Sequence, residues 1–186
     1  MSKPKFSPRN PPMTVEFSAP DGALPPLVPE RIEDAHAVDT LIERAFGPGR
    51  YAKAAERLRE HNRPLLDISF TAWCGNELVG CVRMWPIVIG DEPAVLLGPF
   101  AVEPDWRSRG LGAALIQQAC QAAEAASHAL IFLVGDEPYF GPLGFQVVPP
   151  GRIRMPGPVD PNRVMYMTLS GEPDLTGEVK AAPRAP

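Results

Sequence analysis

The hydrophobic positions of this chain fall into short apolar runs bounded by Gly, Pro, Asn and Asp, and into longer stretches with a helical period. Short apolar or alternating runs are typical of β-strands, and the turn residues between them mark the strand ends. The sequence therefore predicts strands at 27–29, 65–73, 78–89, 96–102, 129–134, 145–148 and 164–169.

Three stretches between these runs carry apolar residues at helical spacing. Residues 111–126 have a single apolar stripe that starts at Leu111, as an amphipathic helix requires. Two more helices are expected at 35–45 and 51–61. In the last of these the inward side chains should be Ala54, Ala55 and Leu58, and the outward ones Lys53, Glu56, Arg57, Arg59 and Glu60.

The order of these elements predicts the fold class. The runs at 65–73 and 78–89 are separated by a Gly-Asn turn and form a hairpin, which continues into 96–102 as an antiparallel meander. The helix at 111–126 then connects 96–102 to 129–134, and such a crossover makes the two strands parallel. We therefore expect an α/β (α+β) fold with a mixed, mostly antiparallel sheet, a central parallel β-α-β unit and helices on both faces.

Gly98 and Pro99 interrupt the apolar run at 96–102. Because proline cannot donate a ladder hydrogen bond, it is found in strands mainly at bulges or edges. The dipeptide therefore predicts a β-bulge in the central strand.

The chain has 186 residues, which is enough for one compact domain. Many of its 24 prolines lie near the two ends, where they remove backbone donors and disfavour regular structure. We expect a proline-rich flexible tail at 1–23, one domain at 24–170 and a second flexible tail at 171–186.

Charge and cysteine content exclude several classes of protein. The net charge of −4 provides no basic field for nucleic acid. No apolar run reaches the ~18 residues of a membrane span, and the N-terminus lacks the apolar core of a signal peptide. A cytoplasmic protein without nucleic-acid or membrane partners is therefore expected. The three cysteines lack C-x-x-C spacing, so neither a disulfide framework nor a metal site is predicted.

The turn at 107–112 carries the clearest candidate chemistry. Gly110 and Gly112 lie where the helix begins, so unpaired backbone N–H groups point out of its first turn with no side chain to shield them. These N–H groups, the helix dipole and the charges of Arg107 and Arg109 all favour an anion such as a pyrophosphate. The motif lacks the third Gly or Ala of a dinucleotide fingerprint and the Gly-Lys-Ser/Thr of a P-loop.

The segment 97–112, Leu-Gly-Pro-Phe-Ala-Val-Glu-Pro-Asp-Trp-Arg-Ser-Arg-Gly-Leu-Gly, resembles the strand and acyl-coenzyme A binding turn of the GCN5-related N-acetyltransferase (GNAT) family. Gly144 and Phe145, after an aromatic pair, resemble the turn that closes the family's cofactor site. The resemblance covers about 27–169 and implies a GNAT-like fold with acetyl-CoA as co-substrate and no metal. The residues that it assigns to coenzyme A are Phe100, Ala101, Val102, Arg107, Ser108, Arg109, Gly110, Leu111, Gly112 and Ala113.

The resemblance leaves the catalytic residues open. Many family members carry a Tyr five residues before the Phe of the Gly-Phe pair, where it protonates the departing thiolate, and here that position is Phe140. Tyr139 is the candidate substitute, against a packing role in which the thiolate leaves unassisted or takes its proton from water. The candidate general bases, besides water, are Glu103 at the end of the central strand, Asp136, Glu77 and Asp91.

The expected function is the transfer of acetyl from acetyl-CoA to a primary amine of a small molecule or peptide, by direct attack in a ternary complex. The resemblance places residues 46–62 over the acceptor, so this segment should select it, and the acidic net charge would if anything tolerate a cationic acceptor. Phe140 favours one alternative, a non-catalytic CoA-binding sensor or interaction module. A nucleotide-phosphate binder is a second alternative, and a homodimer is left open.

Overall fold

A computed structural model of the chain describes residues 23–182. The tail expected at 1–23 therefore lies, except for residue 23, outside the described residues. The strands are β1 (Leu27–Pro29), β2 (Phe70–Cys74), β3 (Glu77–Ile89), β4 (Glu92–Val102), β5 (Leu130–Val134), β6 (Gln146–Val147), β7 (Ile153–Arg154), β8 (Val164–Thr168) and β9 (Gly177–Ala181). The α-helices are α1 (Ala35–Phe46), α2 (Ala54–Arg57), α3 (Leu111–Ala125) and α4 (Glu137–Phe140). The 3-10 turns are η1 (Ile32–Asp34), η2 (Pro48–Ala52), η3 (Leu66–Ile68), η4 (Pro104–Trp106), η5 (Gly141–Leu143) and η6 (Pro161–Arg163).

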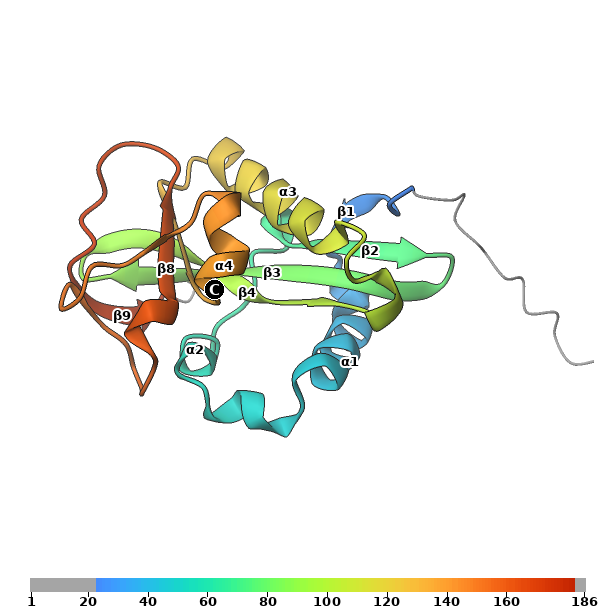
Figure 1. The fold of residues 1–186 in the computed structure, drawn as a ribbon, viewed down its shortest axis with the longest axis horizontal. Helices are drawn as coiled ribbons and strands as arrows, with labels where there is room; N and C mark the ends of the chain where they lie inside the picture. The colour runs from blue at the N-terminus through green and yellow to red at the C-terminus, as the bar shows by residue number, and fades with distance from the viewer. Residues whose placement is uncertain (1–22, 183–186) are drawn as a thin grey trace, which may run out of the picture.

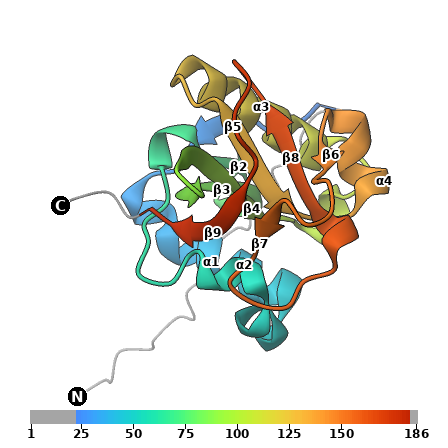
Figure 2. The same cartoon turned by 90° about the vertical axis from the view of Figure 1, so that its left-hand side faces the viewer.

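The strands form one mixed sheet in the order β1-β2-β3-β4-β5-β8-β6, and β9 pairs with the free part of the β3 edge. Within this order, only the neighbours β4 and β5 run parallel, and α3 connects them. Helices α1 and α2 lie on one side of the sheet, and α3 and α4 lie on the other (Figure 1). When the cartoon is turned by 90°, α3 again lies above the strands, and α1 and α2 lie below them (Figure 2). The predicted fold class is confirmed.

Hydrophobic packing explains why the helices lie where they do. The stripe of α3, from Leu111 through Leu115 to Ile116, is fully buried against β2, β3 and β4. On the opposite face, Val38 and Leu41 of α1 pack against the sheet in a separate cluster. Burial of a side chain such as these contributes about 1.5–3 kcal/mol, which fixes each helix on its own face.

A β-bulge interrupts the pairing of β3 and β4. Val82 pairs with Phe100 and Met84 pairs with Leu97, so Gly98 and Pro99 of β4 stand opposite Arg83 alone. Gly98 has a φ of +113°, a backbone conformation that favours glycine. The bulge expected from the Gly-Pro dipeptide is confirmed.

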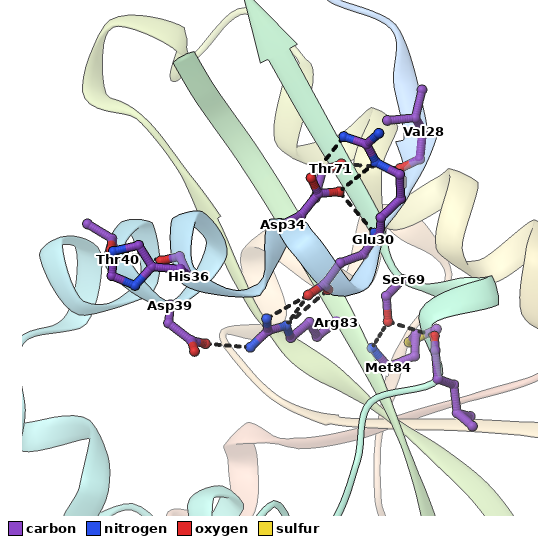
Figure 3. Close-up of polar contacts among 12 residues, drawn as sticks. Val28, Glu30, Asp34, His36, Asp39, Thr40, Ser69, Thr71, Arg83 and Met84 are labelled. Carbon is purple, nitrogen blue, oxygen red and sulfur yellow. Dashed lines mark hydrogen bonds and ion pairs between the residues drawn. The ribbon is translucent and has the colours of Figure 1, made fainter. Parts of the chain in front are cut away.

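Arg83 anchors β1 and α1 at the level of the bulge (Figure 3). Its guanidinium donates to Glu30, which follows β1, at 2.6 and 2.9 Å and to Asp39 of α1 at 2.6 Å. Burial by itself would lower the pKa of Arg83, but the hydrogen bonds and the charges of Glu30 and Asp39 outweigh it, so that the pKa is raised. A buried charge of this kind holds its partners in one arrangement.

The C-terminal segment is not the flexible tail that we expected for 171–186. Residues 177–181 form β9, which pairs with Ile87, Val88 and Ile89 of β3, and Val179 is completely buried. Leu175 joins the same hydrophobic cluster. The expectation is therefore wrong for residues 171–182, while 183–186 lie outside the described residues.

The segment at 51–61 is also less helical than expected. The helix α2 covers only Ala54–Arg57, and the 3-10 turn η2 precedes it. The side chain of Leu58 is buried as predicted. The thiols of Cys81 and Cys120 are buried, and burial raises the pKa of both to about 12.

We predict that Glu30→Gln destabilises the fold by about 3 kcal/mol, because it keeps the shape of the side chain but leaves the buried charge of Arg83 short of its main partner. Chemical denaturation measures the loss. Glu33→Gln is the control, since Glu33 is 67% exposed and its ion pair with Arg31 lies on the surface. Equal stability of the Glu30→Gln and Glu33→Gln variants would contradict a role of the buried pair.

Candidate active site

The strands β4 and β5 diverge after two paired residues. Val95 pairs with Ile131 and Leu96 with Phe132, and no strand in residues 23–182 pairs with that edge of β4 beyond Leu96. The strands separate where the bulge begins at Gly98. Backbone groups along this edge are thus available to a ligand that can act as an added strand.

A pocket of about 400 Å³ opens at this divergence. One wall comes from β4, including Gly98 and Phe100, and the opposite wall comes from the end of β5 and from Asp136. Residues of the segment that links α1 to α2 form a third wall, and Figure 1 shows this segment beneath the sheet. The size is that of a small-molecule site.

The turn before α3 is open to solvent and rich in unpaired donors. Ser108 and Gly110 have φ values of +60° and +87°, so the chain reverses sharply before the helix begins. The first amide of α3 that donates a hydrogen bond is that of Ala114, to the carbonyl of Gly110, and in residues 23–182 the amides of Leu111, Gly112 and Ala113 have no acceptor. Together with the helix dipole, these donors are suited to a phosphate group.

The two arginines of this turn differ in their contacts. Arg107 Nε donates to the carbonyl of Val102 at 3.0 Å, which ties the turn back to the end of β4. The guanidinium of Arg109 lies 5.3 Å from the ring centroid of Trp106. The carbonyl of Val102 thus already accepts one bond from the protein, and the side chain of Ala101 packs toward α1.

An aromatic cluster connects the turn to the pocket. The rings of Phe100 and Tyr139 are stacked with centroids 5.8 Å apart, and Phe140 contacts both rings edge-on. A Cβ atom on Gly112 would come within 2.7 Å of the Tyr139 hydroxyl and 3.3 Å of the Phe100 ring. A side chain at 112 would therefore displace the Tyr139 ring and crowd Phe100, which lies between the turn and the pocket.

A tyrosine that protonates the thiolate would be expected at position 140, but that residue is Phe140, and the tyrosine is the preceding residue, Tyr139. Phe140 is buried and lines the pocket, whereas the Tyr139 hydroxyl lies at the start of α3 beside Gly112. Partial burial raises the pKa of Tyr139, so that the phenol stays protonated at neutral pH. The hydroxyl can therefore donate a hydrogen bond beside Gly112, at the start of α3.

Glu103 is not brought to the pocket. Its carboxylate forms an ion pair with Arg44 of α1 just beyond the end of β4, and Glu103 is not among the residues that line the pocket. Of the other candidate bases, Asp136 lines the pocket, where it forms a 3.0 Å ion pair with Arg163. Of the predicted candidate bases Glu103, Asp136, Glu77 and Asp91, Asp136 is thus the one that lines the pocket.

The sequence analysis missed a buried polar group in the pocket. Glu56 and Arg59 were expected to point outward, but each side chain is only 14% exposed, and Arg59 Nε donates to the carbonyl of Gly98 at 3.2 Å. Arg50, which also lines the pocket, is equally buried. For Arg59 the physical reason is that α2 ends at Arg57, so the following residues do not continue its outward face, and Glu56 is buried in its ion pair with Arg59.

None of the helices in residues 23–182 combines the length and the apolar character that a membrane crossing needs. In the same residues, no group of three or more His, Cys, Asp or Glu side chains is placed to hold a metal ion.

Comparisons with known proteins identify the arrangement. The structure is similar to the GNAT family N-acetyltransferase YhbS from Escherichia coli in complex with CoA, with a TM-score of 0.72 and 24% identity over 89% of this chain and 94% of the other. It is also similar to a GNAT family acetyltransferase from Brucella melitensis in complex with acetyl-CoA, with a TM-score of 0.62 and 22% identity over 84% of this chain and 94% of the other.

A third similar structure is the ribosomal-protein-S18-alanine N-acetyltransferase from Escherichia coli, with a TM-score of 0.55 and 20% identity over 79% of this chain and 95% of the other. Among curated protein sequences no match was found. At these identities the three structures show a common fold. The sequence model of the acetyltransferase (GNAT) family matches residues 35–139, more than half of the length, and the chain therefore belongs to this family.

Proposed function

We propose that the protein is an acyl-CoA-dependent N-acyltransferase that transfers acetyl from acetyl-CoA to a primary amine of a small molecule, by direct attack in a ternary complex. One observation carries the proposal: the unpaired edge of β4 connects the free amides at the start of α3 to the pocket at the bulge. The complexes of similar structures with CoA and with acetyl-CoA support the choice of co-substrate.

The residues fit the parts of coenzyme A in order along this edge. The amides of Leu111, Gly112 and Ala113 would bind the diphosphate, with charge added by Arg107 and Arg109. The amides of the pantetheine arm would pair with the free backbone groups of β4 beyond Leu96. The thioester would then lie at the bulge, inside the pocket.

For the transfer itself the protein needs to stabilise the developing negative charge and to accept one proton. The amine nitrogen forms a bond to the acyl carbon, the carbon–sulfur bond breaks, and the sulfur leaves as thiolate and is protonated to the thiol. A backbone N–H near the bulge would stabilise the negative charge that develops on the carbonyl oxygen. Asp136 would take the proton that the amine loses, directly or through water.

We assign Tyr139 to co-substrate binding rather than to protonation of the thiolate. The hydroxyl lies beside Gly112, at the diphosphate end of the proposed binding path. The side chain at the usual tyrosine position, Phe140, cannot donate a proton. The leaving thiolate would therefore take its proton from water.

Thiol release from acetyl-CoA over a panel of primary amines tests the proposed function. Amine-dependent release supports an enzyme. Binding of CoA without release on any amine would favour the sensor, and competition by ADP as strong as that of CoA would favour a nucleotide-phosphate binder, because ADP lacks the pantetheine arm.

Gly112 lies at the start of α3, where the diphosphate is proposed to bind. Gly112→Glu should lower the affinity for CoA by at least about a hundredfold, because the new side chain fills the space at the free amides and repels the diphosphate. Calorimetric titration of CoA measures the change. Gln121→Glu adds the same charge on an exposed position of α3 and should bind CoA as the wild type does. Unchanged affinity of the Gly112→Glu variant would refute this site.

Two roles of Tyr139 can be distinguished, co-substrate binding and protonation of the leaving thiolate. Tyr139→Phe should raise KM for acetyl-CoA about fivefold and leave kcat unchanged, because it removes one hydrogen bond at the diphosphate end. Tyr166→Phe on β8 is the control, since its hydroxyl contacts only Gln146 among the residues described. A fall in kcat at constant KM would instead make Tyr139 the general acid.

Asp136 is the proposed base for the amine. Asp136→Asn should lower kcat by about a hundredfold at neutral pH, because the amide cannot accept the proton of the amine. Asp174→Asn is the matched control, since Asp174 also pairs with an arginine on the surface and does not line the pocket. If both variants turn over like the wild type, the proton goes directly to water.

A further inference from the structure

The pocket wall formed by residues 50–59 carries a buried group of unbalanced charge. Glu56 forms ion pairs with Arg59, at 2.8 Å, and with Arg50, at 3.8 Å, and all three side chains are only 14% exposed. One carboxylate cannot neutralise two guanidinium groups. A positive charge therefore remains at a place that is largely shielded from water, where it needs a further anion.

The hydrogen bonding of the two arginines is also incomplete. Arg50 Nη2 donates to the Tyr51 hydroxyl at 2.9 Å, but Arg50 Nε is buried and has no acceptor in residues 23–182. Arg59 uses Nε on Gly98 and Nη1 on Glu56, and in the same residues no acceptor is found for its Nη2. The protein itself thus leaves donors of both guanidinium groups unused.

The electrostatic environment of Arg59 agrees with this geometry. Burial lowers the pKa of Arg59, the attraction and hydrogen bond of Glu56 oppose that effect, and the charge of Arg50 lowers the pKa further. An anion bound between the two arginines would offset both the burial and their mutual repulsion.

Carboxylates reach the pocket from other segments. Asp136 follows β5 and forms a 3.0 Å ion pair with Arg163, which also lines the pocket, and Asp160 precedes η6. The pocket therefore has a cationic wall from the segment between α1 and β2 and acidic groups from the segments that follow β5. A ligand with one positive and one negative group would match both sides.

We infer that the acceptor is a small amino acid, an amine that also carries a carboxylate, and that Arg50 and Arg59 bind this carboxylate. The inference rests on the proposed N-acyl transfer. A guanidinium group matches a carboxylate through two parallel N–H···O bonds. Because Arg59 is hydrogen-bonded to Gly98, a carboxylate held there keeps the amine a few bonds away, next to the bulge and the proposed base. The net charge of the chain would if anything tolerate a cationic acceptor, whereas the local charge of the pocket points to an acceptor that also carries a carboxylate.

The first experiment compares acceptors that differ only in the negative group: an amino acid, its amide, its decarboxylated amine and the corresponding aminoalkyl phosphate. Thiol release from acetyl-CoA should give a kcat/KM about tenfold to a hundredfold higher for the amino acid than for its amide or amine. Equal values for the amino acid and the amine overturn the inference. A preference for the phosphate overturns the assignment to a carboxylate.

The second experiment assigns the subsite to its residues. Arg50→Gln should lower kcat/KM for the amino acid about tenfold, change that for the decarboxylated amine less than about twofold, and leave KM for acetyl-CoA unchanged. Arg50→Lys should restore part of the loss, because it restores the charge. Arg57→Gln is the matched control, since Arg57 lies in the same segment but is 56% exposed and pairs with Glu60. Equal losses for both acceptors in Arg50→Gln would overturn the role of Arg50.

A binding measurement separates failure of this inference from failure of the proposed function. If no acceptor is acetylated although CoA binds, the proposed function is wrong, and the amino acid is then titrated calorimetrically into the CoA-saturated wild type and the Arg50→Gln variant. Binding by the wild type that is lost in the variant supports the carboxylate subsite. Absence of binding by the wild type overturns it.

Discussion

The bulge at Gly98 and Pro99 is the constraint on which the site depends. Two residues of β4 stand opposite Arg83 of β3, so β4 bends at this point and its other edge turns away from β5. Pairing between β4 and β5 therefore ends at Leu96. If the two strands continued to pair, the sheet would close over the place where the pocket lies. The pocket and the free edge of β4 have the same cause.

The buried ion pairs of Arg83 connect this bulge to the rest of the acceptor side. Arg83 holds Glu30 and Asp39 by short hydrogen bonds, and Asp39 belongs to α1. Since the segment that carries Arg50 and Arg59 follows α1, its starting point is fixed relative to the bulge. Arg59 then reaches back to the carbonyl of Gly98 and fixes the other end of the segment. The pocket wall formed by residues 50–59 is thus attached to the bulge at its start, through α1 and Arg83, and at its end, through Arg59.

Features that depend on neighbouring residues could be predicted from the sequence. The Gly-Pro dipeptide was enough for the bulge, and the apolar stripe with its two glycines was enough for the turn and for α3. The strand β9 could not be predicted, because its stability comes from the distant edge of β3 and from burial of Val179, while its own surroundings are rich in proline and glycine. The inward direction of Arg59 was missed because helical periodicity was extended beyond Arg57, where α2 ends.

In the proposed site, main-chain groups contact the co-substrate and side chains contact the acceptor. The proposed co-substrate contacts use backbone groups at the start of α3 and along β4, and such contacts tolerate wide variation in the surrounding side chains. Structures with 20–24% identity to this chain keep the same fold. On the other side of the pocket Arg50 and Arg59 line it and Glu56 pairs with both, so that here the charges depend on residue type. Under the proposed function we expect selectivity for the acceptor to arise in the segment between α1 and β2, because burial lets a local pair of arginines outweigh screened charges on the surface.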